Sequence, residues 1–436
     1  MAEQYQVSGR TAADIVTSVE AGIRLNHLAP GTTLPPVRRL AADLAVSPAT
    51  VAAAYRTLRQ RGIVETAGRN GTRIRHRPPV AHRAAEPLPD GVLDLTTGEP
   101  DASLLPDLTI ALARVDTTPR GYAHASVLPV LEQLTRERLL AEGIDGDITV
   151  TGGALDGIDR VLSAHLGPGD LVGIEDPCWA NLRDLIAALG QRMVPVPVDE
   201  CGPTPEGVAA AIRHGAKAIV ITSRAQNPTG VDITATRARE LRDILSRHRE
   251  VLVIEDDHWA ELSQAPVNVV ADAVDNWIFL RSVSKPYGPD LRLATAVGDP
   301  ATIARLKGRM RIGSGWVSTV LQELVVELMA DPATADTIAR ASRRYRSKQR
   351  RLCGALADHG ITAFGDSGLN VWVHVNDETS TVTALRDRGY AVAPGARSRI
   401  ESPPAIRITI SGLPEDRISA LAEAVAAVPG NTSPLA

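Results

Sequence analysis

The chain has few cysteines, few aromatic residues and no long apolar run. Its three cysteines, Cys178, Cys201 and Cys353, are far apart and show none of the ligand spacings of a metal site. So little cysteine fits a reducing compartment, and we expect a cytoplasmic protein with no metal. No stretch approaches the ~20 apolar residues of a transmembrane helix. The first ten residues also lack the apolar core of a secretory signal, so no membrane association is expected.

Lysine is scarce as well, and it is absent from the N-terminal segment. Residues 1–77 contain eleven arginines and five acidic residues, a balance of 11 − 5 = +6. The net charge of the whole chain is −4, so the remainder carries −4 − 6 = −10. A length of 436 residues favours two or three domains. A basic segment joined to an acidic body predicts a polyanionic partner for the first segment alone.

The basic segment has the pattern of three helices and a hairpin. Residues 12–28 and 37–45 repeat apolar positions at helical spacing. Ser47 is the expected N-cap of a third helix, in which Val51, Ala54 and Leu58 face inward. A turn signal, GRNG, separates two short β runs over 63–76. This order predicts a winged helix-turn-helix whose third helix enters the major groove of DNA.

The stretch PGTTLPPVRRLAADLAVSPATVAAAYRTLRQRGIVETAGRNGTRI resembles the GntR-type DNA-binding domain in register over nearly its whole length. Pro48 stands where that family often has a base-contacting arginine, so Thr50 and Arg56 become the candidates for base or phosphate contact. The alternative is a small helical domain with a solvated basic face. The expected DNA-contacting residues are Arg38, Arg39, Ser47, Thr50, Tyr55, Arg56, Arg69 and Arg73.

Three segments are expected along the chain. Residues 1–77 form the winged helix-turn-helix domain. Residues 78–91 are rich in proline and alanine and form a linker. From Val92 to residue 436, strand-like apolar runs alternate with helical patterns, which predicts a mainly parallel sheet covered by helices on both faces. The expected strands are DITVTGG, LVGIEDP, AIVITS, VLVIEDD and WIFLRSVSK.

Ligands bind such sheets beyond the carboxyl ends of the strands, and the residues there form a chemically coherent set. The turn TGGALDG would present the backbone amides of Ala154 and Leu155 to an anion at a helix N-terminus. Singly, each residue has an ordinary structural explanation, such as a cap or a packed side chain. The other members are Trp179, Asn227, Asp256, Lys285 and Arg292.

One ligand accounts for the whole set: a planar, phosphorylated heterocycle that carries an aldehyde and a cationic ring nitrogen. A lysine amine forms a Schiff base with the aldehyde, and a carboxylate keeps the ring nitrogen protonated. An aromatic ring stacks on the heterocycle, while a helix N-terminus, serines and an arginine bind phosphate. That ligand is pyridoxal 5′-phosphate.

Over roughly residues 92–430 the body resembles the fold-type I aminotransferases. The resemblance implies the α/β fold of pyridoxal-phosphate-dependent transferases, with a smaller C-terminal α+β subdomain. It makes Lys285 the Schiff-base lysine and pairs Asp256 with the pyridine nitrogen. It also implies that Asn227 bonds the ring 3-oxygen and that Trp179 stacks on the ring.

The same resemblance assigns the remaining contacts. Arg407, in AIRITI, matches the arginine that binds the substrate carboxylate. His258 stands where the family commonly has a tyrosine that bonds the ring 3-oxygen, so we expect turnover to be weak or absent. Tyr122 matches a loop that reaches the partner subunit's phosphate. The implied phosphate ligands within the chain are Ser282, Ser284, Arg292 and the amides of Ala154 and Leu155.

A GntR-type reader joined to an aminotransferase-like body is the arrangement of the MocR family, which the chain resembles over nearly its whole length. The resemblance implies a homodimeric transcriptional regulator of double-stranded DNA that senses pyridoxal phosphate or an amino compound reacting with it. Control of vitamin B6 metabolism is the expected role. The alternative is a catalytically active aminotransferase that carries a DNA-binding domain. A third reading is a dimerisation scaffold without cofactor.

Overall fold

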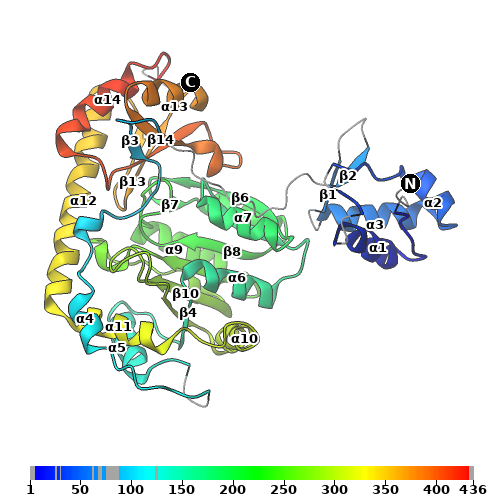
Figure 1. Ribbon diagram of the computed structural model, residues 1–436, viewed down its shortest axis with the longest axis horizontal. Coiled ribbons are helices and arrows are strands. Elements are labelled where there is room, and N and C mark those ends of the chain that lie inside the picture. Colours follow the sequence, from blue (N-terminus) through cyan, green and yellow to red (C-terminus); the bar gives the residue numbers. More distant parts are fainter. Residues whose placement is uncertain are drawn as a thin grey trace. The chain divides into compact units, whose positions relative to one another are not determined.

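The computed structural model describes residues 5–24, 27–29, 31–60, 63–66, 71–74, 88–122 and 126–431. These residues form a small N-terminal domain and a much larger body (Figure 1). Only residues 88–91 of the expected linker are described, so the domain limits at 77 and 92 stay predictions. Within the described ranges, no helix has the length and apolarity needed to cross a membrane.

The N-terminal domain has the predicted order of elements. Helices α1 (Ala12–Arg24), α2 (Val37–Asp43) and α3 (Pro48–Gln60) precede strands β1 (Val64–Thr66) and β2 (Thr72–Ile74). The two strands pair antiparallel, as expected of a wing. The Oγ of Ser47 accepts a hydrogen bond from the Thr50 amide at 3.1 Å, so the predicted N-cap of α3 is confirmed.

The core of this domain follows from helical spacing. Ile15 and Val19 of α1 and Val51, Ala54 and Leu58 of α3 are completely buried. Positions four and seven residues apart lie on one face of a helix, so these two apolar stripes can pack against each other.

Tyr55 corrects one prediction. It was expected on the outer face of α3 as a DNA contact, but it is only 3% exposed and its hydroxyl donates to the Pro35 carbonyl at 2.7 Å. Position 55 lies one turn after Val51 and three residues before Leu58, so its backbone position belongs to the apolar stripe. The hydroxyl is satisfied inside the domain, and the ring is part of its core.

The body is built on a mixed sheet of eight strands. All five predicted strands are present, and β9 pairs parallel with both β8 and β10. Three strands of this sheet, β6, β7 and β11, were not predicted; β11 runs antiparallel to β10 and to β4. The strand order is β4 (Asp147–Thr151), β11 (Ala294–Gly298), β10 (Asn276–Ser282), β9 (Leu252–Asp257), β8 (Ala216–Thr222), β5 (Leu171–Asp176), β6 (Arg192–Asp199) and β7 (Gly202–Pro203).

This topology brings the functional candidates to one edge of the sheet. Since β11 runs antiparallel to both of its neighbours, β4 points the same way as β10, β9 and β8. Their carboxyl ends therefore lie at the same edge, which is where ligands bind in such sheets. The register places Asp256 opposite Thr222 on β8 and opposite Leu280 on β10.

Several body helices begin with a cap that the sequence makes explicit. Thr204, Asp299 and Asp331 each accept backbone hydrogen bonds through their side chains, and each is followed by a proline at the first helical position. The helices that connect the large sheet are α5 (Pro129–Ala141), α6 (Ala154–His165), α7 (Ala180–Ala188), α8 (Pro205–Arg213), α9 (Ala235–Leu245) and α10 (Pro300–Arg311).

A second sheet of five strands forms the predicted C-terminal subdomain. Its order is β12 (Ala363–Phe364), β13 (Asn370–His374), β15 (Ala405–Thr409), β14 (Tyr390–Pro394) and β3 (Leu93–Leu95). The first strand of the body, β3, thus pairs with β14 near the end of the chain. The long helix α12 runs along one side of the body (Figure 1). The accompanying helices are α4 (Thr109–Arg114), α11 (Thr319–Ala330), α12 (Pro332–Asp358), α13 (Glu378–Asp387) and α14 (Ile418–Ala426).

Candidate functional site

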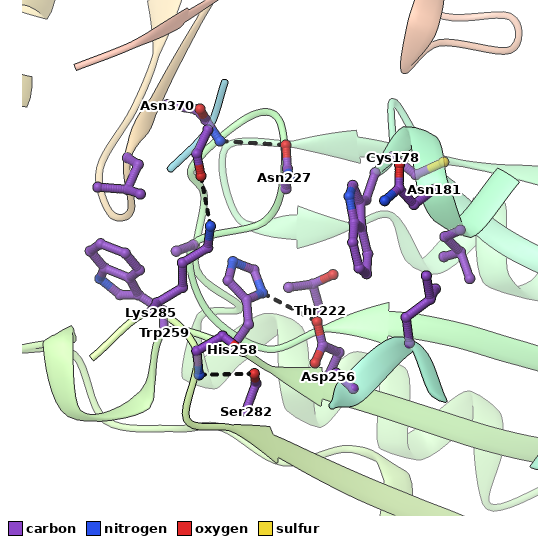
Figure 2. A pocket seen from close by; sticks show the side chains of 18 of the residues that line it. Cys178, Asn181, Thr222, Asn227, Asp256, His258, Trp259, Ser282, Lys285 and Asn370 are labelled. Carbon is purple, nitrogen blue, oxygen red and sulfur yellow. Dashed lines mark hydrogen bonds and ion pairs between the residues drawn. The ribbon is translucent and has the colours of Figure 1, made fainter. Parts of the chain in front are cut away.

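A cavity of about 350 Å³ lies at the carboxyl edge of the large sheet. Figure 2 shows side chains from the strand ends and from the small subdomain pointing into it. Eleven of the twelve residues predicted to bind the cofactor or the effector carboxylate line this one cavity: Ala154, Leu155, Trp179, Asn227, Asp256, His258, Ser282, Ser284, Lys285, Arg292 and Arg407.

Lys285 enters the cavity from the loop that follows β10. Its Nζ donates to the Gly98 carbonyl at 2.6 Å. Burial lowers the pKa of this amine to about 8, with the positive charge of Arg407 acting in the same direction. A lysine with such a pKa is partly neutral near physiological pH, which is the form that attacks carbonyl carbon.

Asp256, near the end of β9, is 7% exposed, and its two carboxylate oxygens have different surroundings. One oxygen, Oδ2, lies 3.2 Å from Nδ1 of His258. The other, Oδ1, is buried and has no hydrogen-bond partner among the described residues. A buried carboxylate oxygen without a donor is costly, so this atom suits a ligand that brings a hydrogen-bond donor or a positive charge.

An anion cradle lies at the other side of the cavity, where β4 meets α6. Gly153 has φ of +104°, and a Cβ there would lie 2.6 Å from Nη2 of Arg292. The Arg292 guanidinium also donates to the Ser284 hydroxyl at 3.3 Å. The backbone amides in the first turn of α6, together with Arg292 and two serines, are groups of the kind that bind phosphate.

Arg407 on β15 brings the small subdomain into the same cavity. Its Nη1 donates to Oδ1 of Asn227 at 3.4 Å, and its Nη2 donates to the Thr96 carbonyl. Burial lowers the pKa of Arg407 to about 10, with the charge of Arg397 acting in the same direction. Its Nε is buried without a partner among the described residues. Such an arginine favours an anionic ligand, such as a carboxylate.

Buried ion pairs fix the strand ends beneath the cavity. The carboxylate of Asp257, which is fully buried, accepts from Arg224 at 3.0 Å and from Arg281 at 2.9 Å. Although burial opposes it, these two guanidinium groups keep the pKa of Asp257 below its usual value. Because Arg281 precedes Ser282 and Asp257 follows Asp256, the pairs hold neighbouring site residues in register.

Sequence reasoning missed several residues of the site. Glu175 on β5 is 4% exposed and accepts from both the amide and the hydroxyl of Thr222, at 3.0 and 2.9 Å. Burial raises the pKa of Glu175 to about 7. Asn370 on β13 donates to Asn227 at 3.4 Å. Glu175 was visible at a strand end in LVGIEDP, whereas nothing near Asn370 in the sequence marks it as a site residue.

Tyr122 does not lie in the cavity of its own chain. It is 94% exposed, and its ring packs edge-on against Trp316 with centroids 5.7 Å apart. This exposure leaves open the predicted contact with a partner subunit, which stays a prediction.

The N-terminal domain presents several arginines to solvent. Arg38, Arg39 and Arg56 are exposed, and Thr50 is half-buried at the start of α3. Arg73 on the wing is paired with Glu65 at 2.8 Å, which offsets its charge. Arg69 lies outside the described residues.

Two protein families match the chain in separate segments. Residues 90–425 match the family Aminotransferase class I and II. Residues 11–74 match the family Bacterial regulatory proteins, gntR family. The second match spans the three helices and the wing, and the first spans nearly all of the body.

Curated relatives resemble this chain across both segments. The vitamin B6 salvage pathway transcriptional repressor PtsJ of Salmonella typhimurium is 39% identical over 95% of this chain and 98% of its own length. The HTH-type pyridoxine biosynthesis transcriptional regulator PdxR of Corynebacterium glutamicum is 27% identical over 84% of this chain and 83% of its own length. The probable rhizopine catabolism regulatory protein MocR of Rhizobium meliloti is 24% identical over 88% of this chain and 86% of its own length.

A solved structure shares the fold of the body. LysN, an alpha-aminoadipate aminotransferase from Thermus thermophilus, superposes with a TM-score of 0.68 at 21% identity. The match covers 77% of this chain and 92% of LysN. At this identity the likeness concerns the fold alone.

Proposed function

We propose that this chain, which belongs to the MocR-type transcriptional regulators, binds pyridoxal 5′-phosphate and that this binding changes its affinity for DNA. In these regulators a GntR domain precedes an aminotransferase class I and II domain. Aminotransferase domains of this class typically bind this cofactor. The observation that carries the proposal is one cavity that holds both Lys285 and Oδ1 of Asp256, an oxygen with no partner in the described part of the chain.

The residues present fit the cofactor at three separated points. A protonated ring nitrogen supplies the donor that Asp256 Oδ1 lacks among the described residues. The cradle at Gly153, which a Cβ would fill, and Arg292 suit the phosphate. Lys285, with a pKa of about 8, suits an aldehyde. Asp256 lies on β9, whereas Gly153 follows β4 and Lys285 follows β10. No one of the three groups alone would specify the ligand.

Each residue then has a defined task. Lys285 would hold the cofactor covalently through Nζ, and Asp256 would keep a proton on the ring nitrogen. Trp179 would stack on the ring, with Asn227 and His258 on its polar edge. When bound, the cofactor supplies an electron sink for amino compounds. The phosphate would be held by Ser282, Ser284, Arg292 and the amides of Ala154 and Leu155, and an effector carboxylate by Arg407.

The N-terminal domain would read double-stranded DNA. The exposed Arg38, Arg39 and Arg56 suit phosphate contacts, with α3 in the major groove. Arg73 on the wing is a predicted outer contact, and so is Arg69, which lies outside the described residues. We propose a homodimer, in which two readers recognise two half-sites and Tyr122 reaches the partner's phosphate site.

Vitamin B6 metabolism is the regulated pathway that we propose. The names of two relatives, PtsJ and PdxR, concern vitamin B6 salvage and pyridoxine biosynthesis. A regulator whose signal is the active form of the vitamin would close a feedback loop on its own supply.

The test uses the full-length protein and the intergenic region beside its gene. Pyridoxal phosphate should give the visible absorbance of a covalently attached cofactor and should change DNA affinity. Lys285→Ala should lose both, whereas Lys307→Ala, at an exposed lysine on α10, should keep both. DNA affinity that is the same with and without pyridoxal phosphate would refute the sensing role.

Turnover as an aminotransferase is the second candidate. It is favoured by Arg407 and Asn227, which share the cavity with Lys285. Repeated conversion of an amino acid to its oxo acid by the loaded protein would establish it. A single conversion that stops at one equivalent would leave the regulator as the sole function.

A further inference from the structure

One short segment of the body accepts hydrogen bonds from Lys285 and Arg407, the two cations that the proposed ligand would contact. Residues 96–99, here called the strap, follow β3 directly, and Thr97, Gly98 and Glu99 line the cavity. The Gly98 carbonyl accepts from Lys285 Nζ at 2.6 Å. The Thr96 carbonyl accepts from Arg407 Nη2. Both cations therefore already have an internal partner.

The closed position of the strap is well defined. The Thr96 amide donates to Oδ1 of Asp94 at 2.8 Å. The Gly98 amide donates to Oγ1 of Thr409 at 3.2 Å, which ties the strap to β15. Gly98 has φ of +67°, a conformation that L-residues with a side chain disfavour.

A ligand must compete with these contacts. When the neutral amine of Lys285 captures an aldehyde, a C=N bond replaces C=O and the oxygen leaves as water with both amine hydrogens. The nitrogen then no longer has an ammonium group to donate to Gly98. A carboxylate on Arg407 would compete in the same way with the Thr96 carbonyl.

We propose that the strap is a built-in competitor of the ligand, and that its displacement begins the signal to the DNA-binding domain. The inference rests on the proposed function. Through β3 and Val92 the strap is joined to the expected linker, residues 78–91, so it is the part of the cavity wall nearest along the chain to the DNA-binding domain. Displacing the strap would therefore move the part of the body to which the linker is attached. Since coupling is reciprocal, a weakened strap should raise ligand affinity and shift DNA affinity in the direction that ligand shifts it.

The experiment compares two glycine substitutions in the full-length protein. Gly98→Ala places a side chain at φ of +67°, where the new Cβ would meet no atom nearer than 3.6 Å, so the cost falls on the closed backbone alone. Gly143→Ala is the matched control: its φ is +79°, it has nothing within 4 Å, and it lies outside the cavity. Gly98→Ala should bind pyridoxal phosphate more tightly by about two- to fivefold, while Gly143→Ala should bind as the wild type does.

Two further readouts follow the strap itself. Hydrogen exchange in peptides spanning residues 96–99 should become faster when the wild type binds pyridoxal phosphate. Ligand-free Gly98→Ala should show part of the change in DNA affinity that the cofactor produces in the wild type. If Gly98→Ala matches Gly143→Ala in both affinities, or if exchange is unchanged or slower, the strap is not a competitor. Failure of the wild type to bind pyridoxal phosphate at all would instead overturn the proposed function.

Discussion

The two domains carry their charges in opposite ways. In the N-terminal domain, Arg38, Arg39 and Arg56 stand on the surface, where water and salt screen them. In the body, Asp256 is almost completely buried, and burial shifts the pKa values of Lys285 and Arg407. Many exposed charges together attract a polyanion, whereas each buried charge acts on one chemical group of the ligand. DNA binding should therefore weaken only gradually as single charges are removed, whereas loss of one charge in the cavity should weaken ligand binding strongly.

The largest difference between the domains is expected from Asp256→Asn. The amide keeps the shape of the carboxylate but loses its charge, so it cannot stabilise a protonated ring nitrogen. Loss of one charge-assisted hydrogen bond predicts pyridoxal phosphate affinity lower by about ten- to a hundredfold. Titration by absorbance measures it. DNA affinity without cofactor should stay at the wild-type value, and a comparable loss there would contradict the separation of the two domains.

The pH dependence of cofactor attachment tests whether Lys285 behaves as a buried amine, in contrast to the exposed charges of the N-terminal domain. Only the neutral amine of Lys285 attacks an aldehyde, and its pKa lies at about 8 because burial disfavours the ammonium ion. The neutral fraction rises by about tenfold per pH unit below that value and then levels off. Stopped-flow absorbance should show this rise and a plateau above about pH 8. A rate that keeps rising towards the ordinary lysine pKa of about 10.4, as for an unburied amine such as free butylamine, would contradict the buried lysine.

Sequence reasoning found most of the cavity because its residues sit at strand ends. A strand of apolar residues is recognisable locally, and parallel pairing then brings the ends of VLVIEDD and WIFLRSVSK together whatever the rest of the fold does. Asn370 and the strap come from the small subdomain, at long separation in sequence, and no local pattern marks their approach. Strand β11 escaped notice because its five residues, Ala294–Gly298, carry no alternation to distinguish them from a buried turn.

In the N-terminal domain, the sequence predicted the fold better than the position of single side chains. Helical spacing and the cap at Ser47 predicted the elements correctly. The same spacing puts Tyr55 on the buried face, so the prediction that it contacts DNA was wrong. The physical reason is that tyrosine can be buried when its hydroxyl finds one acceptor, here the Pro35 carbonyl.

Arg56→Ala tests the exposed face of α3 with a smaller effect. Removal of one phosphate contact should weaken binding to all DNA sequences alike and reduce the slope of log affinity against log salt by about one. Fluorescence anisotropy over a salt series measures both. Arg311→Ala, at an exposed arginine on α10 of the body, is the control and should leave the slope unchanged. An unchanged slope for Arg56→Ala would remove this residue from the interface.

Tyr55→Phe is expected to give the smallest effect, and it tests whether Tyr55 belongs to the domain core or contacts DNA. The Tyr55 hydroxyl donates to the Pro35 carbonyl, so loss of that hydroxyl should lower the free energy of unfolding of the N-terminal domain by about 1 kcal/mol. The salt slope of DNA binding should not change, because a side chain that is 3% exposed makes no phosphate contact. Thermal unfolding and the same salt series provide both numbers. If the slope fell while stability held, Tyr55 would be a DNA contact after all, and the assignment of α3 faces would have to be reversed.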